Sequence, residues 1–322
     1  MFHEAVVTRS RTLSTTCTKP RRGLRAVAAM ALGLVLLVGG ALAVRPLQVA
    51  SASIASAHDL AALLDGIGYR IAALHEPDGR APRLVLQRLP DGMAALDPEI
   101  DRKRTFLRAL LPLVLAANEA VLEDRAFLTG LQEAVAEGAS PSQADRRRVL
   151  ALLTRYRAEV APEAPFAAVL AALLPRVDVV PPSLALAQAA VESGWGTSRF
   201  SLEGNALFGQ SSWNEDGMAP LGHDEPPFRV AAFASLQDCV EAYVANLNSH
   251  PAYAGFRTLR AAQRASGAAP DGRALAATLL AYAETGAVYT ATLRAVIDGN
   301  DLDRLDHVRL DDGRTLLVMA HR

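Results

Sequence analysis

Residues Ala190 to Phe200 read AVESGWGTSRF, and they follow the small apolar run LALAQAA. This pattern predicts a helix from Ser183 to about Ser193 that is buried on most sides. The helix ends on a carboxylate, Glu192, and the chain then breaks at once into Ser-Gly-Trp-Gly. A charged residue at the end of a buried helix is unusual enough to suggest a functional role.

Glu192 has the setting of a general acid. It lies at the negative end of the helix dipole, which disfavours ionisation, and partial desolvation raises its pKa further. A carboxyl group that stays protonated near neutral pH can protonate a glycosidic oxygen. Gln188 lies four residues earlier and shares its helix face, while Trp195 is placed to wall a cleft. The residues alone leave a second interpretation open, in which Glu192 is a solvated helix end and Trp195 a core residue.

The composition indicates a globular protein without a nucleic-acid partner. The chain has 322 residues, of which 51% are apolar and 21% charged, with a net charge of -1. A nucleic-acid partner would require a clustered basic excess, which is absent. The two cysteines, Cys17 and Cys239, are far apart in the sequence, and no metal-ligand spacing occurs. We therefore expect no metal, no cofactor and no internal disulfide.

An apolar segment near the N-terminus predicts contact with a membrane. Residues 26–44 carry no charge, with Arg21, Arg22 and Arg25 before them and Arg45 after. About twenty helical residues span a bilayer, and the basic side stays in the cytoplasm. Ala41-Leu42-Ala43 also fits a signal-peptidase site. The alternatives are thus an inner-membrane anchor facing the periplasm, a cleaved signal of a periplasmic protein, or a buried helix.

Local patterns predict further helices. A helix from about Asp101 should be kinked or divided by Pro112, and another should begin at Ser140-Pro141. The remaining predicted helices cover 164–174, a segment starting at Ser235, 274–283 and 287–297.

Strands are fewer. RLVLQRL (83–89) and FRVAAF (228–233) are strand candidates, and the tail from His307 resembles a hairpin around Asp312-Gly313. Residues 46–60 are rich in Ala and Ser, which is typical of a linker.

The central stretch resembles a known family. AQAAVESGWGTSRF (187–200) with GNALFGQ (204–210) resembles the glucosaminidase family of bacterial wall hydrolases, and FRVAAFAS resembles that family's following strand. Three further segments are similar to its bacterial Bax-like subgroup: 106–125, 243–260 and 279–302. The resemblance covers roughly residues 80 to 306.

The resemblance implies a mainly α (α+β) fold, with a lysozyme-like helical catalytic lobe, a small β-lobe and the N-terminal signal or anchor helix before them. The expected organisation is a signal or anchor at 1–45, a linker or stalk at 46–80, a helical region at 81–175, the glucosaminidase domain at 176–306 and a hairpin-like tail at 307–322.

It also implies roles for particular residues. Glu192 matches the catalytic acid, and Tyr282 matches a tyrosine beside the scissile bond that we group with the catalytic residues. Asn205, Phe208, Gly209 and Tyr289 match positions of the family near the cleft and are expected to bind substrate. Gln188, by its helix face, and the aromatic residues Trp195 and Trp213 complete the expected substrate-binding set. Packing between helices is the alternative role for the two tyrosines.

A second catalytic group is not fixed by the sequence. Candidate carboxylates in the β-lobe are Glu215, Asp216, Asp224 and Glu225, with Glu203 a further option. The substrate's N-acetyl group is an alternative. The separation of two carboxyl groups would decide retention or inversion.

The expected function is an endo-β-N-acetylglucosaminidase acting on the glycan strands of peptidoglycan. A lytic transglycosylase or muramidase on the same fold, and a non-catalytic wall-binding protein, are the alternatives. NALFG argues against a transglycosylase, which carries a Gly-Leu-Met-Gln-like element there, and the intact Glu192 argues against a binding protein.

Overall fold

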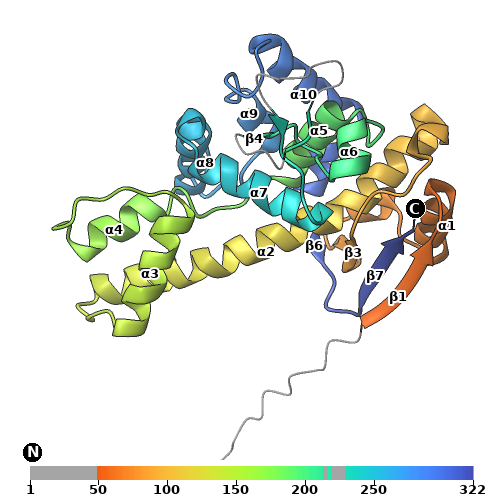
Figure 1. The fold of residues 1–322 in the computed structure, drawn as a ribbon. Coiled ribbons are helices and arrows are strands. Elements are labelled where there is room, and N and C mark those ends of the chain that lie inside the picture. The colour runs from red at the N-terminus through yellow and green to blue at the C-terminus, as the bar shows by residue number, and fades with distance from the viewer. Residues whose placement is uncertain (1–48, 213–216, 220–228, 322) are drawn as a thin grey trace, which may run out of the picture. The chain divides into compact units, whose positions relative to one another are not determined.

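The computed structural model describes residues 49–212, 217–219 and 229–321. The predicted apolar segment 26–44 lies outside these residues, so the anchor and the signal peptide remain predictions. The described part is mainly helical and carries small sheets (Figure 1). This confirms the expected fold class, mainly α with a minor β component.

The helices follow one another along most of the chain. The α-helices are α1 (Ala57–Gly66), α2 (Lys103–Ala136), α3 (Gln143–Arg155), α4 (Phe166–Leu173), α5 (Pro182–Ser193), α6 (Arg199–Gly204), α7 (Leu236–Ser249), α8 (Ala254–Ala265), α9 (Gly272–Ala276) and α10 (Ala287–Gly299). Short 3-10 and π turns are η1 (Ile71–His75), η2 (Met93–Ala95), η3 (Pro98–Arg102), η4 (Pro251–Tyr253) and η5 (Leu302–Leu305).

The strands are short and lie far apart in the chain. They are β1 (Val49–Ile54), β2 (Arg80–Ala81), β3 (Leu84–Leu86), β4 (Ser211–Ser212), β5 (Arg229–Val230), β6 (Arg309–Leu310) and β7 (Thr315–Ala320).

Helix α2 is the long element that contacts both the strands β3 and β6 and the helices α5 and α7 (Figure 1). It runs unbroken through Pro112, so the predicted division of this helix is wrong, while the alternative of a kink at Pro112 stays a prediction. The residues on both sides of the proline, 105–115, are all buried. Their packing offsets the backbone hydrogen bond that proline cannot make. Helix α2 contacts α5 and α7, which carry site residues.

The same helix has the length and apolar composition of a membrane-spanning helix. Among the described residues, Pro98–Ala136 is long and apolar enough to span a bilayer. Most of its apolar window is buried inside the protein, however, as in a core helix. This segment is therefore only weak evidence for a membrane span.

Helices α3 and α4 lie at the C-terminal end of α2 (Figure 1). Helix α3 begins two residues later than predicted, because Ser142 and not Ser140 caps it. The Ser142 hydroxyl accepts from the Asp145 N–H, and the Asp145 carboxylate accepts from the Ser142 N–H. This reciprocal pair satisfies two free donors at the helix start.

The ends of the described chain meet in one parallel sheet. Strand β7 lies between β1 and β3, and β6 pairs with β2 in a second sheet. The predicted tail hairpin is therefore wrong, because β6 and β7 pair with separate distant strands and not with each other. The strand predicted at 83–89 is confirmed as β3, in shortened form.

The predicted linker is also folded in its described part. Val49–Ile54 forms β1, and α1 follows with a capping box between Ser56 and Asp59. Leu60 and Leu64 of α1 are completely buried. The Ala/Ser-rich composition concealed these elements because β1 carries mostly small side chains.

Helix α5 is the centre of the helices that carry the site residues. It packs against α2, α9, α10 and η5 (Figure 1). The predicted start of α7 at Ser235 and the predicted α10 are confirmed. Helix α9 is shorter than predicted and stops at Ala276. Strands β4 and β5 pair in antiparallel fashion beside α6 and form the described part of the β-lobe, which confirms a short strand in FRVAAF.

Candidate active site

Helix α5 delivers a carboxyl group to its own C-terminal end. Residues 182–190 are buried, whereas Glu192 is half-buried. The chain then leaves the helix through Gly194, in the left-handed region at φ 57° and ψ 46°. The Trp195 N–H donates to the Ala190 carbonyl at 2.9 Å and satisfies a free acceptor of the last turn.

Three successive residues adopt positive φ after the helix. Trp195 has φ 58°, between Gly194 and Gly196 at φ 57° and 78°. A side chain at Gly196 would come within 2.7 Å of Leu89 and 3.0 Å of Phe106. Glycine is therefore required there by close packing on α2 as well as by conformation. The tight turn leaves Glu192 as the last side chain of α5 on its face.

Trp195 packs against α2. Its ring meets Phe106 edge-on, with centroids 5.8 Å apart, and the Lys103 ammonium lies 5.6 Å from its centroid. The ring is half-buried. Its predicted contact with sugar thus stays a prediction, and packing on α2 is the role that the structure describes.

Burial raises the pKa of Glu192, and a hydrogen bond with the Tyr289 side chain partly lowers it. The desolvation that the sequence predicted for this carboxyl group is therefore present. Gly209, an exposed residue at φ 60°, faces the same group: a Cβ there would lie 3.0 Å from Glu192 Oε2. Only a residue without a side chain leaves this oxygen open on that side.

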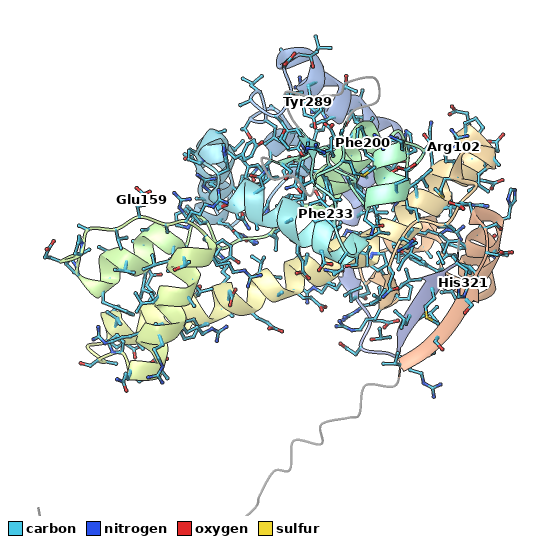
Figure 2. The ribbon with its side chains drawn as sticks, in the orientation of Figure 1. Arg102, Glu159, Phe200, Phe233, Tyr289 and His321 are labelled. Carbon is cyan, nitrogen blue, oxygen red and sulfur yellow. The ribbon has the colours of Figure 1, made fainter. Side chains whose placement is uncertain are left out.

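Four tyrosines from different elements surround the carboxyl group: Tyr243 from α7, Tyr253 from η4, Tyr282 from the α9–α10 connection and Tyr289 from α10. Burial raises the pKa of all four hydroxyls, and the charge of Glu192 contributes to each rise. The rings of Tyr282 and Tyr289 are stacked at 5.6 Å, and Tyr253 lies 5.9 Å from Tyr282. Figure 2 labels Tyr289 among the side chains.

Tyr282 ties this cluster to the loop that follows α6. Its hydroxyl donates to the Phe208 carbonyl at 2.9 Å. Helix α9 ends at Ala276, so Tyr282 makes this contact from the connection that follows the helix. Tyr282 is half-buried and packs on the core, so the packing expected as its alternative role is present.

The loop itself is fixed from below. Asn205 ends α6 in the left-handed conformation and donates from its amide to the Phe233 carbonyl at 3.0 Å. The Phe208 ring stacks on Tyr243 at 3.9 Å. Asn205 and Phe208 are 5% and 1% exposed, so both support the loop from the core. The predicted contact of the Phe208 ring with sugar is wrong, because Tyr243 covers that ring.

Gln188 also requires a correction. It shares the helix face of Glu192, as predicted, but it is completely buried and cannot touch a substrate. Its amide nitrogen donates to the Tyr289 hydroxyl at 2.9 Å, and its amide oxygen accepts from the Tyr243 hydroxyl at 2.7 Å. Tyr289 is itself only 5% exposed. Both residues therefore act behind the carboxyl group.

Sequence analysis missed Tyr243 and Tyr253 as members of the site. Tyr243 lies in the apolar stripe of α7 and is completely buried. A buried tyrosine hydroxyl usually finds a hydrogen-bond partner, and a tyrosine in an otherwise apolar stripe was the available signal that this face of α7 does more than pack.

The second carboxylate is not located. Trp213, Glu215, Asp216, Asp224 and Glu225 lie outside the described residues. Glu203 is exposed on α6 and forms an ion pair with Arg199 at 3.2 Å. Within the described ranges, no three His, Cys, Asp or Glu side chains form a group that could hold a metal ion.

Comparisons with known proteins show the family to which the chain is related. The family model described as Glucosaminidase, mannosyl-glycoprotein endo-beta-N-acetylglucosaminidase, matches residues 170–302. The chain is 33% identical over 202 residues to the protein bax of Escherichia coli, covering 62% of this chain and 70% of that protein.

A solved structure is also similar. The catalytic domain of the autolysin Auto from Listeria monocytogenes aligns at 18% identity over 67% of this chain and 94% of that domain, with a TM-score of 0.37. This likeness is too weak to bear on function. The matched family region contains α5 and every tyrosine around Glu192.

Proposed function

Because the chain belongs to the Bax-like family of glucosaminidase-domain proteins, we propose that it is a peptidoglycan hydrolase. The proposed reaction is endo-β-N-acetylglucosaminidase cleavage, in which the β-1,4 bond after N-acetylglucosamine is hydrolysed. Peptidoglycan as the substrate rests on the resemblance of ESGWG and NALFG to bacterial wall hydrolases. The single observation that supports the chemistry best is the state of Glu192.

Glu192 combines three properties that a glycosidase acid requires. It is half-buried, burial raises its pKa, and the glycine opposite leaves Oε2 uncovered. A carboxyl group whose pKa is raised by burial keeps its proton to a higher pH than a free glutamic acid does, and it can release that proton to a leaving oxygen. In the described surroundings it faces tyrosines and not a cation that would hold it ionised.

In the proposed reaction, Glu192 donates its proton to the oxygen of the scissile bond as that bond breaks. The Tyr289 hydroxyl stabilises the carboxylate that is left. Tyr282 lies beside the acid and is fixed by its bond to the Phe208 carbonyl, so we assign it to the subsite next to the cleaved bond. Trp195 would line the cleft further out.

A second group must then activate water or stabilise the developing positive charge. Glu215, Asp216, Asp224 and Glu225 of the β-lobe are our candidates, and the acetamido group of the substrate is the alternative. A carboxylate at about 5–5.5 Å from Glu192 would give retention, and one at about 6.5–9.5 Å would give inversion. We propose no metal and no cofactor.

We also propose that the domain works outside the cytoplasm. The basic residues before 26–44 would keep the N-terminus in the cytoplasm and place the rest in the periplasm. This holds whether the segment stays as an inner-membrane anchor or is removed. The proposed partners are thus the glycan strands and, if the segment is retained, the membrane.

Mass spectrometry of reaction products tests the proposal. The purified protein is incubated with isolated peptidoglycan, and the released fragments are reduced and analysed. Fragments that end in reducible N-acetylglucosamine support it. Anhydro-muramic or reducible muramic ends would assign the enzyme to the transglycosylases or muramidases instead. Sedimentation with the wall without any released fragments would favour a binding protein.

A further inference from the structure

The buried residues behind Glu192 form a chain of hydrogen bonds with one direction. The Tyr243 hydroxyl donates to the Gln188 amide oxygen at 2.7 Å, and the Gln188 amide nitrogen donates to the Tyr289 hydroxyl oxygen at 2.9 Å. Tyr289 in turn interacts with the Glu192 carboxyl group. This hydrogen-bond chain thus begins on α7, crosses α5 and reaches Glu192 from α10.

Each bond fixes the direction of the next. An amide has donors on its nitrogen and acceptors on its oxygen only. Because Tyr243 donates to the oxygen, the amide nitrogen must face Tyr289 and donate to it. The Tyr289 oxygen is then an acceptor in that bond, and its own proton remains for Glu192.

We propose that Gln188 and Tyr243 are positioning residues, which direct the Tyr289 hydroxyl at Glu192 and so determine which carboxyl oxygen carries the acidic proton. One oxygen accepts from Tyr289 in either protonation state. The acidic proton therefore resides on the other oxygen, from which it is released to the substrate. The inference rests on the proposed function for its catalytic meaning, but the hydrogen-bond chain is testable without substrate.

The surroundings of Gln188 and Tyr243 keep the hydrogen-bond chain in one arrangement. Gln188 and Tyr243 are both completely buried, so water does not compete for their hydrogen bonds. Tyr243 is clamped by its stacking on Phe208. In the described part of the chain, the titratable groups that face Glu192 are Tyr243, Tyr253, Tyr282 and Tyr289. Tyr289 is the one that bonds to the carboxyl group.

The test is a carboxyl-carbon NMR titration of Glu192 in the full chain. The protein is labelled with ¹³C-glutamate, and the Glu192 signal is assigned by its loss in Glu192→Gln. Tyr289→Phe removes the donor and should raise the titration midpoint by about one pH unit, the value of one hydrogen bond to a charged group.

Tyr243→Phe is the decisive variant, because it removes one oxygen and keeps the stacked ring. Without its donor, the Gln188 oxygen turns to accept from Tyr289, whose proton is then withdrawn from Glu192. The midpoint should rise in the same direction as in Tyr289→Phe. Gln188→Leu removes this competing acceptor, so Tyr289 keeps its proton for Glu192 and the midpoint should stay closer to the wild-type value than in Tyr243→Phe. Tyr156→Phe is the matched control, since that hydroxyl is buried in another part of the protein without a partner among the described residues, and its loss should leave the midpoint unchanged.

A wild-type midpoint in folded Tyr243→Phe would overturn the proposal, even if Gln188→Leu fails to fold. The pH dependence of turnover gives a second readout, because its Glu192 limb should move with the midpoint. If the wild type releases no fragments from peptidoglycan while the midpoint moves as described, the proposed function fails and the positioning chain stands. If turnover is normal and the midpoint does not move, only the chain fails.

Discussion

Gly209 and Glu192 face each other at the centre of the site. The glycine has φ 60°, and a Cβ at this position would lie 3.0 Å from Glu192 Oε2. A methyl group there would both strain the backbone and cover the carboxyl oxygen that we expect to face the substrate. The identity of this residue therefore matters to the chemistry and not only to the turn.

Gly209→Ala should lower turnover on the order of 10- to 100-fold, because the acid is displaced or covered. The control is Gly267→Ala, whose φ of 80° imposes a similar strain but whose Cβ meets nothing within 4 Å. Turnover is measured on isolated peptidoglycan at equal folded fractions. Equal losses in both variants would mean that strain, and not contact with Glu192, causes the effect.

At this scale the sequence predicted the partly desolvated carboxyl group of Glu192 but not the residues behind it. Glu192 stood out because a carboxylate rarely ends an apolar helix unless it has a functional role or a polar partner there. Helix spacing placed Gln188 on the same face, yet spacing does not tell what covers a face. The coverings are Tyr243 and Tyr289, which come from helices far along the chain, so the burial of Gln188 could not be predicted.

Among the elements, α5 is held at its start as firmly as at its end. The Asp306 carboxylate accepts from the Ser183 N–H and hydroxyl, both at 2.8 Å, and from the Gly272 N–H at 3.3 Å. It thus joins the first turn of α5, the first residue of α9 and the C-terminal segment. Burial raises the pKa of this carboxyl group to about 7, and the neighbouring Asp271 adds to the rise.

This pKa predicts a dependence of stability on pH. A carboxyl group with a raised pKa binds its proton more tightly in the folded state than in the unfolded state. Its contribution to stability is therefore fully present below its ordinary pKa of 3.8 and is lost as the pH rises through about 7.

Asp306→Asn removes the titration and keeps an acceptor for Ser183. The difference between the melting temperatures of the variant and the wild type should be more favourable to the variant at pH 8 than at pH 5. Thermal unfolding at both values measures it. A difference that is the same at pH 5 and pH 8 would contradict the assignment.

Elements with local signals were predictable, and those set by distant pairing were not. Pro182 with its apolar run, and Ser235 with Asp238, mark the starts of α5 and α7 in the sequence itself. The tail has the residues of a hairpin at Asp312-Gly313. Its strands nevertheless pair in parallel with β1, β2 and β3, whose positions the tail does not encode. The unbroken course of α2 through Pro112 could not be predicted either, because the packing that tolerates the proline comes from other elements.

At the scale of the whole described molecule, its two ends form one sheet. Strand β7 is hydrogen-bonded to β1 on one side and β3 on the other (Figure 1). Val318 of β7 is completely buried. Strand β3 and α2 then connect this sheet to the helices of the site. The region expected to be a stalk therefore belongs to the folded unit.

Deletion of residues 313–322 should lower the melting temperature by about 5 °C or more, since β1 and β3 lose their shared partner and Val318 its burial. Removal of only residues 321–322 is the control, because it leaves β7 in place. Differential scanning calorimetry measures both variants. An unchanged melting temperature in the longer deletion would show that the sheet is not integral to the fold.

The central claim is that Glu192 is the catalytic acid, and its most direct test is the Glu192→Gln variant. Glutamine keeps the size of the side chain but has no acidic proton. We predict that the variant folds and still sediments with peptidoglycan, while its rate of glycan cleavage falls by about 100-fold or more, the usual contribution of a general acid. Cleavage within a few-fold of the wild-type rate would contradict the account.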